Sequence, residues 1–227
     1  MDDRKSIEER YVEALGDVRI DFTRSMAPQI YDLMRKIIVQ NRIGPGTPIY
    51  EAKFADIIGV SRTPLRAAMQ QLAKEGLVET RPQVGSIVAP IDQKKIFSAV
   101  FCRGALETAV VRRLASMRPF DISPFLGVLA EQQDFAERHD YIGFFDLDER
   151  FHALLAEAAE VPEAWQLVLS SKTHVDRARM RLQSAAPERA AIAYQQHLDI
   201  IDAIKAGDVE RAVLCMDKHV RSALDII

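Results

Sequence analysis

The segment Gly59-Val-Ser-Arg-Thr-Pro-Leu-Arg66 combines the signals of a tight turn with those of the start of a helix. Glycine accommodates the backbone of a tight turn, and Ser61 stands where a helix N-cap accepts a backbone N–H. Pro64 falls in the first helical turn, where its missing N–H matters least. The segment therefore predicts a turn at its first two residues, followed by a helix that continues to Gly76.

The chain on either side of this segment predicts further helices and strands in a recognisable order. Apolar residues recur at three- and four-residue spacing through residues 30–38, and Gly44-Pro45-Gly46 ends that helical pattern. A second short apolar pattern over residues 54–58 precedes the turn, and two β-like runs, 77–80 and 86–89, follow the third helix. The order helix, helix, turn, helix, hairpin predicts a winged helix-turn-helix.

The rest of the chain shows helical patterns and no convincing strand. The expected helices are 94–117, 121–138, 141–160, 163–184, 187–206 and 208–226. Helices joined by such short loops pack as antiparallel neighbours in a bundle. We therefore expect a mainly α protein: an N-terminal winged helix-turn-helix followed by an all-α antiparallel bundle of six to seven helices.

The predicted organisation has four parts. Residues 1–25 are polar and mixed in charge, and we expect a frayed N-terminal extension there. Residues 26–90 would form the winged helix-turn-helix, residues 91–95 a linker, and residues 96–227 the helical domain.

Net charge hides an asymmetry between these parts. The whole chain carries 30 basic and 33 acidic residues, a net charge of -3, which by itself argues against a nucleic-acid binder. Residues 26–90, however, contain 8 basic and 5 acidic side chains, whereas residues 91–227 contain 17 and 21. A chance difference of this size is an open alternative, but the pattern is typical of a basic nucleic-acid-binding segment joined to an acidic second domain.

Composition also indicates the compartment. Nothing approaches the run of about 18 apolar residues that a membrane span needs, and the N-terminus has no apolar secretory core. Cys102 and Cys215 are too few for a disulfide framework and form no CxxC pair. We expect a cytoplasmic protein that does not associate with membranes.

The start of the third helix carries the residues expected to contact DNA. Arg62 and Arg66 are four apart and share one helix face, so they suit a base edge and a phosphate. Ser61 and Thr63 add short hydroxyls suited to phosphate oxygens. The alternative is that the two arginines are merely solvated. Their position at the N-terminal end of a recognition helix, which enters the major groove, favours DNA.

At these residues the chain resembles the DNA-binding domain of GntR-family transcriptional regulators. The matching stretches are Ile43-Gly-Pro-Gly46, Ala55-Asp-Ile-Ile-Gly-Val-Ser-Arg-Thr-Pro-Leu-Arg66, Leu72-Ala-Lys-Glu-Gly-Leu-Val78 and Gly85-Ser-Ile-Val88. The resemblance implies that Arg62 and Arg66 contact DNA and that Gly85, at the tip of the wing, approaches the minor groove. The chain departs from the family at two positions. Ala67 stands where many members have Glu, a difference without an expected consequence. Val84 stands at a wing position where many members have Arg, so a charged wing contact is not implied.

Four polar residues in the helical region share the spacing of inward-facing positions. Asp148 and His152 are four apart, which places their Cβ atoms roughly 5–6 Å from each other. His197 and His219 each fall in an apolar stripe of their own helix. Three imidazoles and a carboxylate in a bundle core suit Zn²⁺, Ni²⁺, Mn²⁺ or Fe²⁺. Histidines satisfied within the core are the alternative; His139 and His174 lack such clear positions.

This region resembles the FCD (FadR C-terminal) effector domain that follows the winged helix in one GntR subfamily. The matching stretches are Asp148-Glu-Arg-Phe-His152, His197-Leu-Asp-Ile-Ile-Asp-Ala-Ile204, Gly207-Asp208 and Met216-Asp-Lys-His219. The resemblance implies the metal-binding variant, in which Asp148, His152, His197 and His219 hold a divalent ion, most often Zn²⁺. It also implies a small carboxylate effector at the ion, and it makes residues 96–227 an effector-binding and dimerisation domain.

Arginines are the candidates for holding such an effector. Arg103 and Glu107 resemble the R-x-x-x-E pattern of this family, and Arg103 is suited to clamp a carboxylate. An intrahelical salt bridge between the two is an equal alternative. Arg177, Arg179 and Arg181 fan around one helix, so we expect most of them to be solvated, with Arg177 the weakest effector candidate.

The leading hypothesis is a non-enzymatic transcriptional regulator, homodimeric and bound to palindromic double-stranded operator DNA. Repression is the commoner mode in the resembled family, and activation stays open. The second hypothesis is a metal-dependent hydrolytic enzyme, which leaves residues 59–66 unexplained, and the third is a structural metal bundle with no effector.

Overall fold

The computed structural model describes residues 6–17, 19–81, 85–182 and 188–226. The chain divides into two compact units, Met1–Ile91 and Asp92–Ile227. Both are mainly helical, and they are described separately. Among the described residues, no helix combines the length and the apolar content needed to cross a bilayer.

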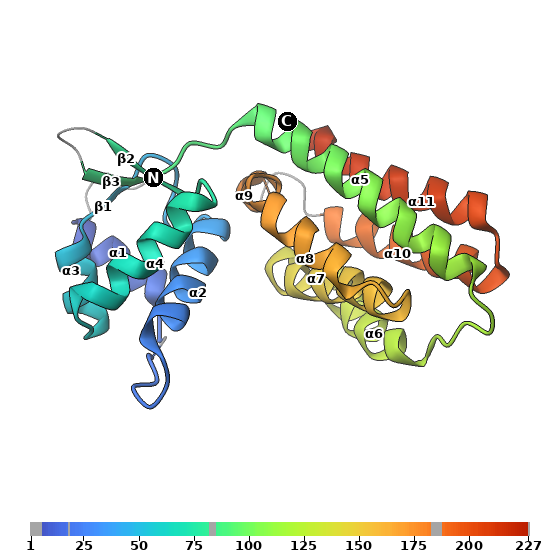
Figure 1. Ribbon diagram of the computed structural model, residues 1–227, viewed down its shortest axis with the longest axis horizontal. Helices are drawn as coiled ribbons and strands as arrows, with labels where there is room; N and C mark the ends of the chain where they lie inside the picture. Colours follow the sequence, from blue (N-terminus) through green and yellow to red (C-terminus); the bar gives the residue numbers. More distant parts are fainter. Residues whose placement is uncertain (1–5, 18, 82–84, 183–187, 227) are drawn as a thin grey trace. The chain divides into compact units, whose positions relative to one another are not determined.

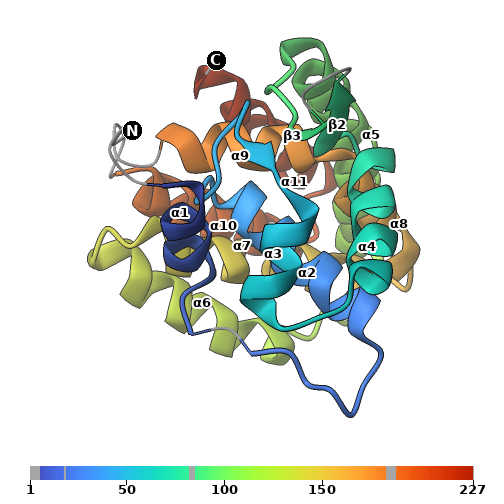
Figure 2. The ribbon, with the colours of Figure 1, turned by 90° about the vertical axis from the view of Figure 1, so that its left-hand side faces the viewer.

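The N-terminal unit has the predicted order of a winged helix-turn-helix (Figure 2). Its elements are α1 (Ile7–Leu15), α2 (Met26–Val39), β1 (Pro48–Ile49), α3 (Glu51–Ile58), α4 (Arg62–Lys74), β2 (Val78–Arg81) and β3 (Gly85–Val88). The apolar stripe of α2 is buried and packs against α4. Gly59 has the left-handed φ of 70° that turns the chain between α3 and α4.

The wing is an antiparallel sheet in the order β1-β3-β2. Val78 pairs with Val88 and Arg81 with Gly85, so the hairpin register runs from the buried base to the exposed tip. The third strand is β1, which enters the sheet through the pairing of Pro48 with Ile87.

The expectation of a frayed extension over residues 1–25 was wrong for its described part. Helix α1 begins with a capping box in which Ser6 and Glu9 each accept the other's backbone N–H. Tyr11 is fully buried, donates to the carbonyl oxygen of Pro48 at 2.7 Å and accepts from the N–H of Tyr50 at 3.0 Å. Because a buried aromatic residue makes these bonds, α1 is part of the winged helix unit and lies against α2 and α3.

Helices alone make up the described part of the C-terminal unit, as predicted. They are α5 (Gln93–Ser116), α6 (Ser123–Glu137), α7 (Tyr141–Ala158), α8 (Pro162–Ser171), α9 (Thr173–Leu182), α10 (Arg189–Ala206) and α11 (Val209–Arg221), followed by the short 3-10 helix Ser222–Ile226. The long helix α5 lies beside α11, and α10 packs on α11 (Figure 1). Helices α6 and α7 pack on each other, and α10 also contacts α6.

The single helix expected over residues 163–184 is two helices in the structure. Helix α8 ends at Ser171 and α9 begins at Thr173. Lys172 between them is buried, and its ammonium contacts Glu149 and Asp176 at 2.7 Å. The residues from Lys172 to Met180 are all buried, so this part of α9 has no solvent-exposed face.

The linker expected over residues 91–95 is shorter in the structure. The side chain of Asp92 accepts the backbone N–H of Lys94 at 2.9 Å, and this N-cap starts α5 at Gln93.

Candidate functional site

The predicted DNA-contacting residues of α4 lie together on the protein surface. Ser61, Arg62, Thr63 and Arg66 are all exposed. Arg62, Thr63 and Arg66 line a surface hollow of about 440 Å³ together with Ala67 and Gln70.

The expected capping bond of Ser61 is absent among the described residues. Ser61 occupies the N-cap position with extended backbone angles, but its side chain makes no capping hydrogen bond. The first N–H groups of α4 therefore have no capping bond from Ser61, and Ser61, Arg62 and Thr63 are exposed at this helix start.

Gly85 begins strand β3 of the wing with a φ of 88°, and no atom of the described residues beyond its chain neighbours lies within 4 Å of where a Cβ would stand. A side chain there would be strained by the backbone angle. Val84, the position where a charged wing contact was not implied, lies outside the described residues.

The four residues predicted to hold a metal ion are brought together by three helices. Asp148 and His152 come from α7, His197 from α10 and His219 from α11. Each offers one ligand atom, and these atoms all lie within 4.8 Å of one another. All four side chains are buried.

Each of the three histidine rings is held through its Nδ1 atom. His197 Nδ1 and His219 Nδ1 are hydrogen-bonded to Gln132 Oε1 and Gln196 Oε1, both at 2.9 Å. His152 Nδ1 lies 2.5 Å from Glu107 Oε2 in an ion-pair contact that does not have hydrogen-bond geometry. Since all three neighbours are oxygen atoms, we assign the ring protons to Nδ1, which directs the Nε2 lone pairs inward. Metal-binding histidines are held by outer partners of this kind.

The inward atoms have no proton to share among themselves. His152 Nε2 lies 3.1 Å from His219 Nε2, and His197 Nε2 lies 3.4 Å from Asp148 Oδ1. Within the described chain, Asp148 Oδ1 and His197 Nε2 are buried atoms with no hydrogen-bond partner. Four converging lone pairs without a donor fit a divalent cation, because a cation satisfies all of them at once.

The protonation states in the cluster agree with this fit. Burial lowers the pKa of His197 to about 4, and burial together with the nearby His197 and His152 lowers the pKa of His219. Burial alone would raise the pKa of Asp148, but Arg179 and the histidines hold it well below its ordinary value. Around neutral pH, His197 and His219 are therefore neutral and Asp148 is a carboxylate, which are the ligand forms.

Aromatic rings enclose the cluster. Phe151 stacks on His197 with ring centroids 4.0 Å apart, and Trp165 stacks on His152 at 5.5 Å. These two rings pack on the faces of the two imidazoles and fix their planes.

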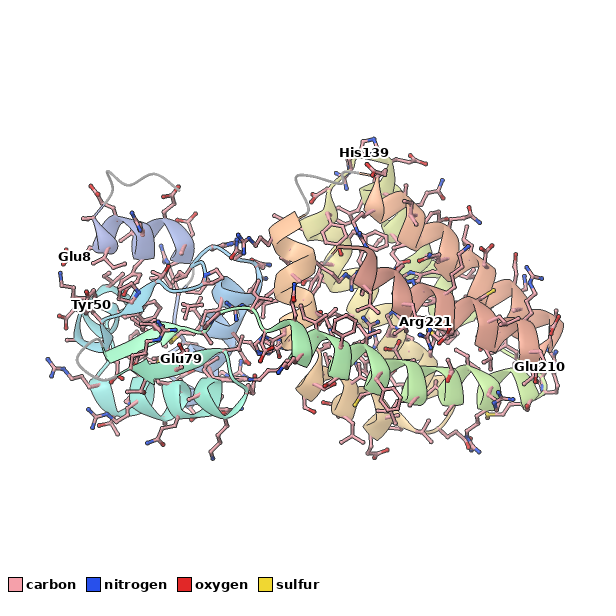
Figure 3. All side chains as sticks on the ribbon, turned by 90° about the horizontal axis from the view of Figure 1, so that it is seen from above. Glu8, Tyr50, Glu79, His139, Glu210 and Arg221 are labelled. Atoms are coloured by element: carbon pink, nitrogen blue, oxygen red, sulfur yellow. The ribbon has the colours of Figure 1, made fainter. Side chains whose placement is uncertain are left out.

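A cavity of about 720 Å³ adjoins the cluster. Its lining residues are Arg103, Tyr141, Arg179, Glu188, Arg189, Ile192, Ala193, Gln196, Lys218, His219, Arg221, Ser222 and Ala223. Arg103 and Arg179 are buried in its wall, whereas Arg221 lies on the surface of α11 (Figure 3). Because His219 belongs to both the cavity wall and the cluster, the cavity reaches the candidate metal centre.

Of the two interpretations of Arg103, the structure shows the salt bridge, and the effector role stays a prediction. Its Nε atom donates to Glu107 Oε1 at 2.7 Å, which is the intrahelical salt bridge, and the residue also lines the cavity.

The prediction for the arginines of α9 needs correction. Arg177 and Arg179 are both buried, and only Arg181 is exposed. Arg177 is not among the residues that line the cavity, whereas Arg179 lines it and donates to Tyr141 Oη at 2.6 Å and Asp148 Oδ2 at 3.1 Å. Because the residues from Lys172 to Met180 are all buried, spacing within α9 could not distinguish Arg179 from its neighbours.

Sequence reasoning also missed the outer partners Gln132 and Gln196. Gln132 falls in the buried stripe of α6, which also contains Phe125, Leu129 and Ala136. An amide inside an apolar stripe was therefore a usable signal. No such signal marked Gln196, which the sequence places among polar neighbours.

The two other histidines lie outside the cluster. His139 is exposed in the turn between α6 and α7 (Figure 3). His174 is buried in α9, where its Nδ1 accepts the backbone N–H of Asp92 at 3.2 Å.

Comparison with known proteins places both units in described families. Residues 26–88 match the bacterial regulatory proteins of the gntR family, and residues 98–222 match the FCD domain.

Several relatives cover almost the whole chain. The HTH-type transcriptional repressor RspR of Escherichia coli K12 is 36% identical over 207 residues, 90% of each chain. A probable D-xylose utilization operon transcriptional repressor of Paenarthrobacter nicotinovorans is 29% identical over 203 residues, 88% of each chain.

Solved structures share the fold at lower identity. McbR/YncC of E. coli has a TM-score of 0.77 at 18% identity, covering 89% of this chain and 97% of its own. A putative GntR regulator from Rhodococcus sp. RHA1 has a TM-score of 0.75 at 22% identity, covering 89% and 98%. The chain belongs to the gntR family of bacterial transcriptional regulators, in the group that carries an FCD domain.

Proposed function

We propose that this regulator is a repressor whose affinity for its operator is controlled by a small carboxylate, bound beside a divalent metal ion in the C-terminal bundle. The observation that carries the proposal is the convergence of Asp148, His152, His197 and His219 beside an arginine-lined cavity. Relatives named as repressors support the direction of control.

The donor set supports a resident metal ion. Asp148 Oδ1 and the Nε2 atoms of the three histidines would hold it, and Zn²⁺ suits three imidazoles and a carboxylate best, with Ni²⁺, Mn²⁺ and Fe²⁺ as alternatives. When bound, the ion supplies a Lewis-acidic positive charge that attracts a carboxylate oxygen. The chain's own contribution is to fix the ligand atoms through Glu107, Gln132 and Gln196.

The cavity supports a small anionic effector. Its volume of about 720 Å³ suits a metabolite, since ligand pockets commonly enclose about 300–1,000 Å³. Arg103 and Arg179 place two buried guanidinium groups in the wall, and guanidinium is suited to hold a carboxylate through paired hydrogen bonds. Tyr141 and Gln196 add neutral polar groups for orientation.

The DNA side of the proposal rests on α4. Arg62, Thr63 and Arg66 would enter the major groove, with Ser61 on the phosphate backbone and Gly85 of the wing near the minor groove. A homodimer would present two such helices to a palindromic operator. This role places the protein in the cytoplasm, with the DNA that it regulates.

A structural role for the metal is the second candidate, favoured by the number of buried protein ligands. Four protein ligands are what a closed structural zinc site has. The cavity that reaches His219 is the feature that a closed site does not need. Metal removal distinguishes the two, because a structural ion would be lost together with the fold, whereas a sensing ion would be lost together with the response to the effector.

A thermal-shift screen tests the proposed function. Metal-loaded and metal-stripped protein would be heated with a panel of small carboxylic and sugar acids. An acid at about 100 times its Kd stabilises by about 2.7 kcal/mol, which raises Tm by roughly 5–10 °C for a chain of this size. We expect such a shift only in metal-loaded protein, and an equal shift in stripped protein would contradict the proposal.

A further inference from the structure

We infer that Glu107 is a positioning residue that couples Arg103 in the cavity wall to the metal ligand His152. This inference rests on the proposed metal site and adds a route by which the two halves of the binding site influence each other.

The geometry places one buried carboxylate between the two groups. Glu107 lies on α5, one helical turn after Arg103, and both side chains are almost completely buried. Its Oε1 atom is 2.7 Å from Arg103 Nε, and its Oε2 atom is 2.5 Å from His152 Nδ1. Each oxygen therefore has a different charged or polar neighbour, and the charge of one carboxylate is divided between them.

His152 differs from the other two histidines in this respect. Its Nδ1 faces a carboxylate, whereas those of His197 and His219 face the neutral amides of Gln132 and Gln196. A carboxylate 2.5 Å from Nδ1 makes the opposite Nε2 atom a better donor to a cation, because the negative charge stabilises a proton on Nδ1. Among the three described rings, only that of His152 has a charged group, the Glu107 carboxylate, at Nδ1 to strengthen the donation of its Nε2 lone pair to a cation.

Arg103 competes with His152 for that carboxylate. The guanidinium attracts electron density toward Oε1 and so weakens the hold of Oε2 on the imidazole proton. Because Arg103 also lines the cavity, an anion that binds there shares the guanidinium and reduces its pull on Glu107. Anion binding in the cavity should therefore strengthen metal binding through His152, and by linkage the metal should strengthen anion binding.

A structural ion pair is the competing explanation. The buried pair between Arg103 and Glu107 would then serve only stability, and its charge would act on the metal as a direct field. The two explanations differ in whether the effect of Arg103 on the metal depends on Glu107.

A double-mutant cycle on Zn²⁺ affinity separates them. The full-length protein and its variants Arg103→Gln, Glu107→Gln and Arg103→Gln/Glu107→Gln would be titrated with Zn²⁺ against a chromophoric chelator. Circular dichroism would establish that each variant is folded. Arg103→Lys is the conservative control because it retains the positive charge beside Glu107.

The coupling predicts effects of opposite sign. Glu107→Gln should weaken Zn²⁺ binding by about 10–100-fold, the usual effect of losing an outer partner of a metal ligand. Arg103→Gln should strengthen binding, and Arg103→Lys should stay near wild type. The increase in Zn²⁺ affinity caused by Arg103→Gln should be more than about twofold smaller in the Glu107→Gln background than in the wild-type background, since residues in contact couple at least this strongly.

An equal gain from Arg103→Gln in both backgrounds would overturn the coupling and leave only a direct field effect. Unchanged affinity in Glu107→Gln would overturn it as well. If that variant does not fold, Glu107→Asp replaces it, because the shorter carboxylate withdraws from His152 and should also weaken binding. A wild-type protein that takes up no Zn²⁺ would instead overturn the proposed metal site, so the two failures are distinguishable.

Discussion

The Nε2 atoms of His152 and His219 lie 3.1 Å apart in the core of the helical bundle, although 67 residues separate these histidines in the sequence. Each ring has an oxygen acceptor at its Nδ1 atom, Glu107 for His152 and Gln196 for His219. Both Nε2 atoms therefore present lone pairs to each other. Two facing lone pairs in a buried site repel unless a cation lies with them, and this relationship underlies the predictions for the bundle.

Replacement of His197 tests the metal site. His197→Ala removes one of the ligand atoms. Loss of a residue that only holds a ligand lowers metal affinity by about 10–100-fold, so loss of the ligand itself should lower the affinity for Zn²⁺ by at least that much. Elemental analysis after gel filtration measures the bound metal. The matched control is His139→Ala, because His139 is exposed and lies outside the cluster. Full metal content in His197→Ala would refute the site.

Replacement of Arg62 tests the recognition helix. Arg62 is exposed at the first turn of α4, so Arg62→Ala should leave the fold intact and cost at least about 1–3 kcal/mol of specific operator affinity, the range for one lost base contact. Fluorescence anisotropy with operator selected from random DNA measures the loss. Lys74→Ala at the far end of the same helix is the control. Wild-type affinity in Arg62→Ala would remove this residue from the interface.

Replacement of Arg103 tests the anion side of the cavity. Arg103→Gln should weaken binding of an acid identified by the thermal screen by roughly 1.5–3 kcal/mol, the range for hydrogen bonds to charged groups. The protein should still hold metal at saturating concentration, because Arg103 is not a ligand. Calorimetry measures the acid affinity, and the exposed Arg112→Gln on the same helix is the control. An acid affinity of Arg103→Gln equal to that of wild type would show that Arg103 does not bind the acid and serves only the salt bridge with Glu107.

Replacement of Tyr11 tests the place of α1 in the winged helix unit. Tyr11→Phe keeps the buried ring but leaves the carbonyl of Pro48 and the N–H of Tyr50 without their partner. The loss should destabilise this unit by about 1–3 kcal/mol. Differential scanning calorimetry of the full chain measures the change, with Tyr50→Phe as the control because Tyr50 is 46% exposed. An unchanged melting temperature for Tyr11→Phe would show that the two hydrogen bonds of Tyr11 do not stabilise the unit.

The buried His174 predicts a loss of stability in mild acid. Burial, together with the positive charges of Lys95 and Arg177, lowers the pKa of His174 to about 4. Because the unfolded chain takes up this proton below a pKa of about 6.5 and the folded chain does not, stability falls as pH drops from about 6.5 toward 4.

His174→Asn removes this titration while its side-chain oxygen still accepts the N–H of Asp92. The variant should lose about 1–2 kcal/mol less than wild type between pH 7.5 and pH 5 in urea unfolding. Parallel pH profiles for the two proteins would contradict the assignment, because His197 and His219 titrate equally in both.

The winged helix and the inward position of each candidate ligand could be predicted because local patterns determine them. Gly59 marks the turn between two helices, and apolar stripes identify the inward positions of His197 and His219. Ser6 and Glu9 form a capping box, which is a local signature of the start of α1. The convergence of ligands from three helices depends instead on contacts between residues far apart in the chain.

The break at Lys172 and the role of Arg179 depend on distant contacts. The sequence around Lys172 contains no proline or glycine, and the interruption is stabilised by Glu149, which lies 23 residues earlier in the chain. Arg179 lines the cavity, and its partner Asp148 is 31 residues away in the chain. Periodicity within one helix contains no information on such contacts.

The most direct test of the account measures operator binding in four states of the full-length protein: with and without Zn²⁺, and with and without the acid that the thermal screen identifies. Fluorescence anisotropy gives the operator Kd in each state. The account predicts that the acid weakens operator binding by about 5–150-fold in metal-loaded protein, the usual range of coupling between sites, and has no effect in folded, metal-stripped protein. The same response to the acid without metal would contradict it.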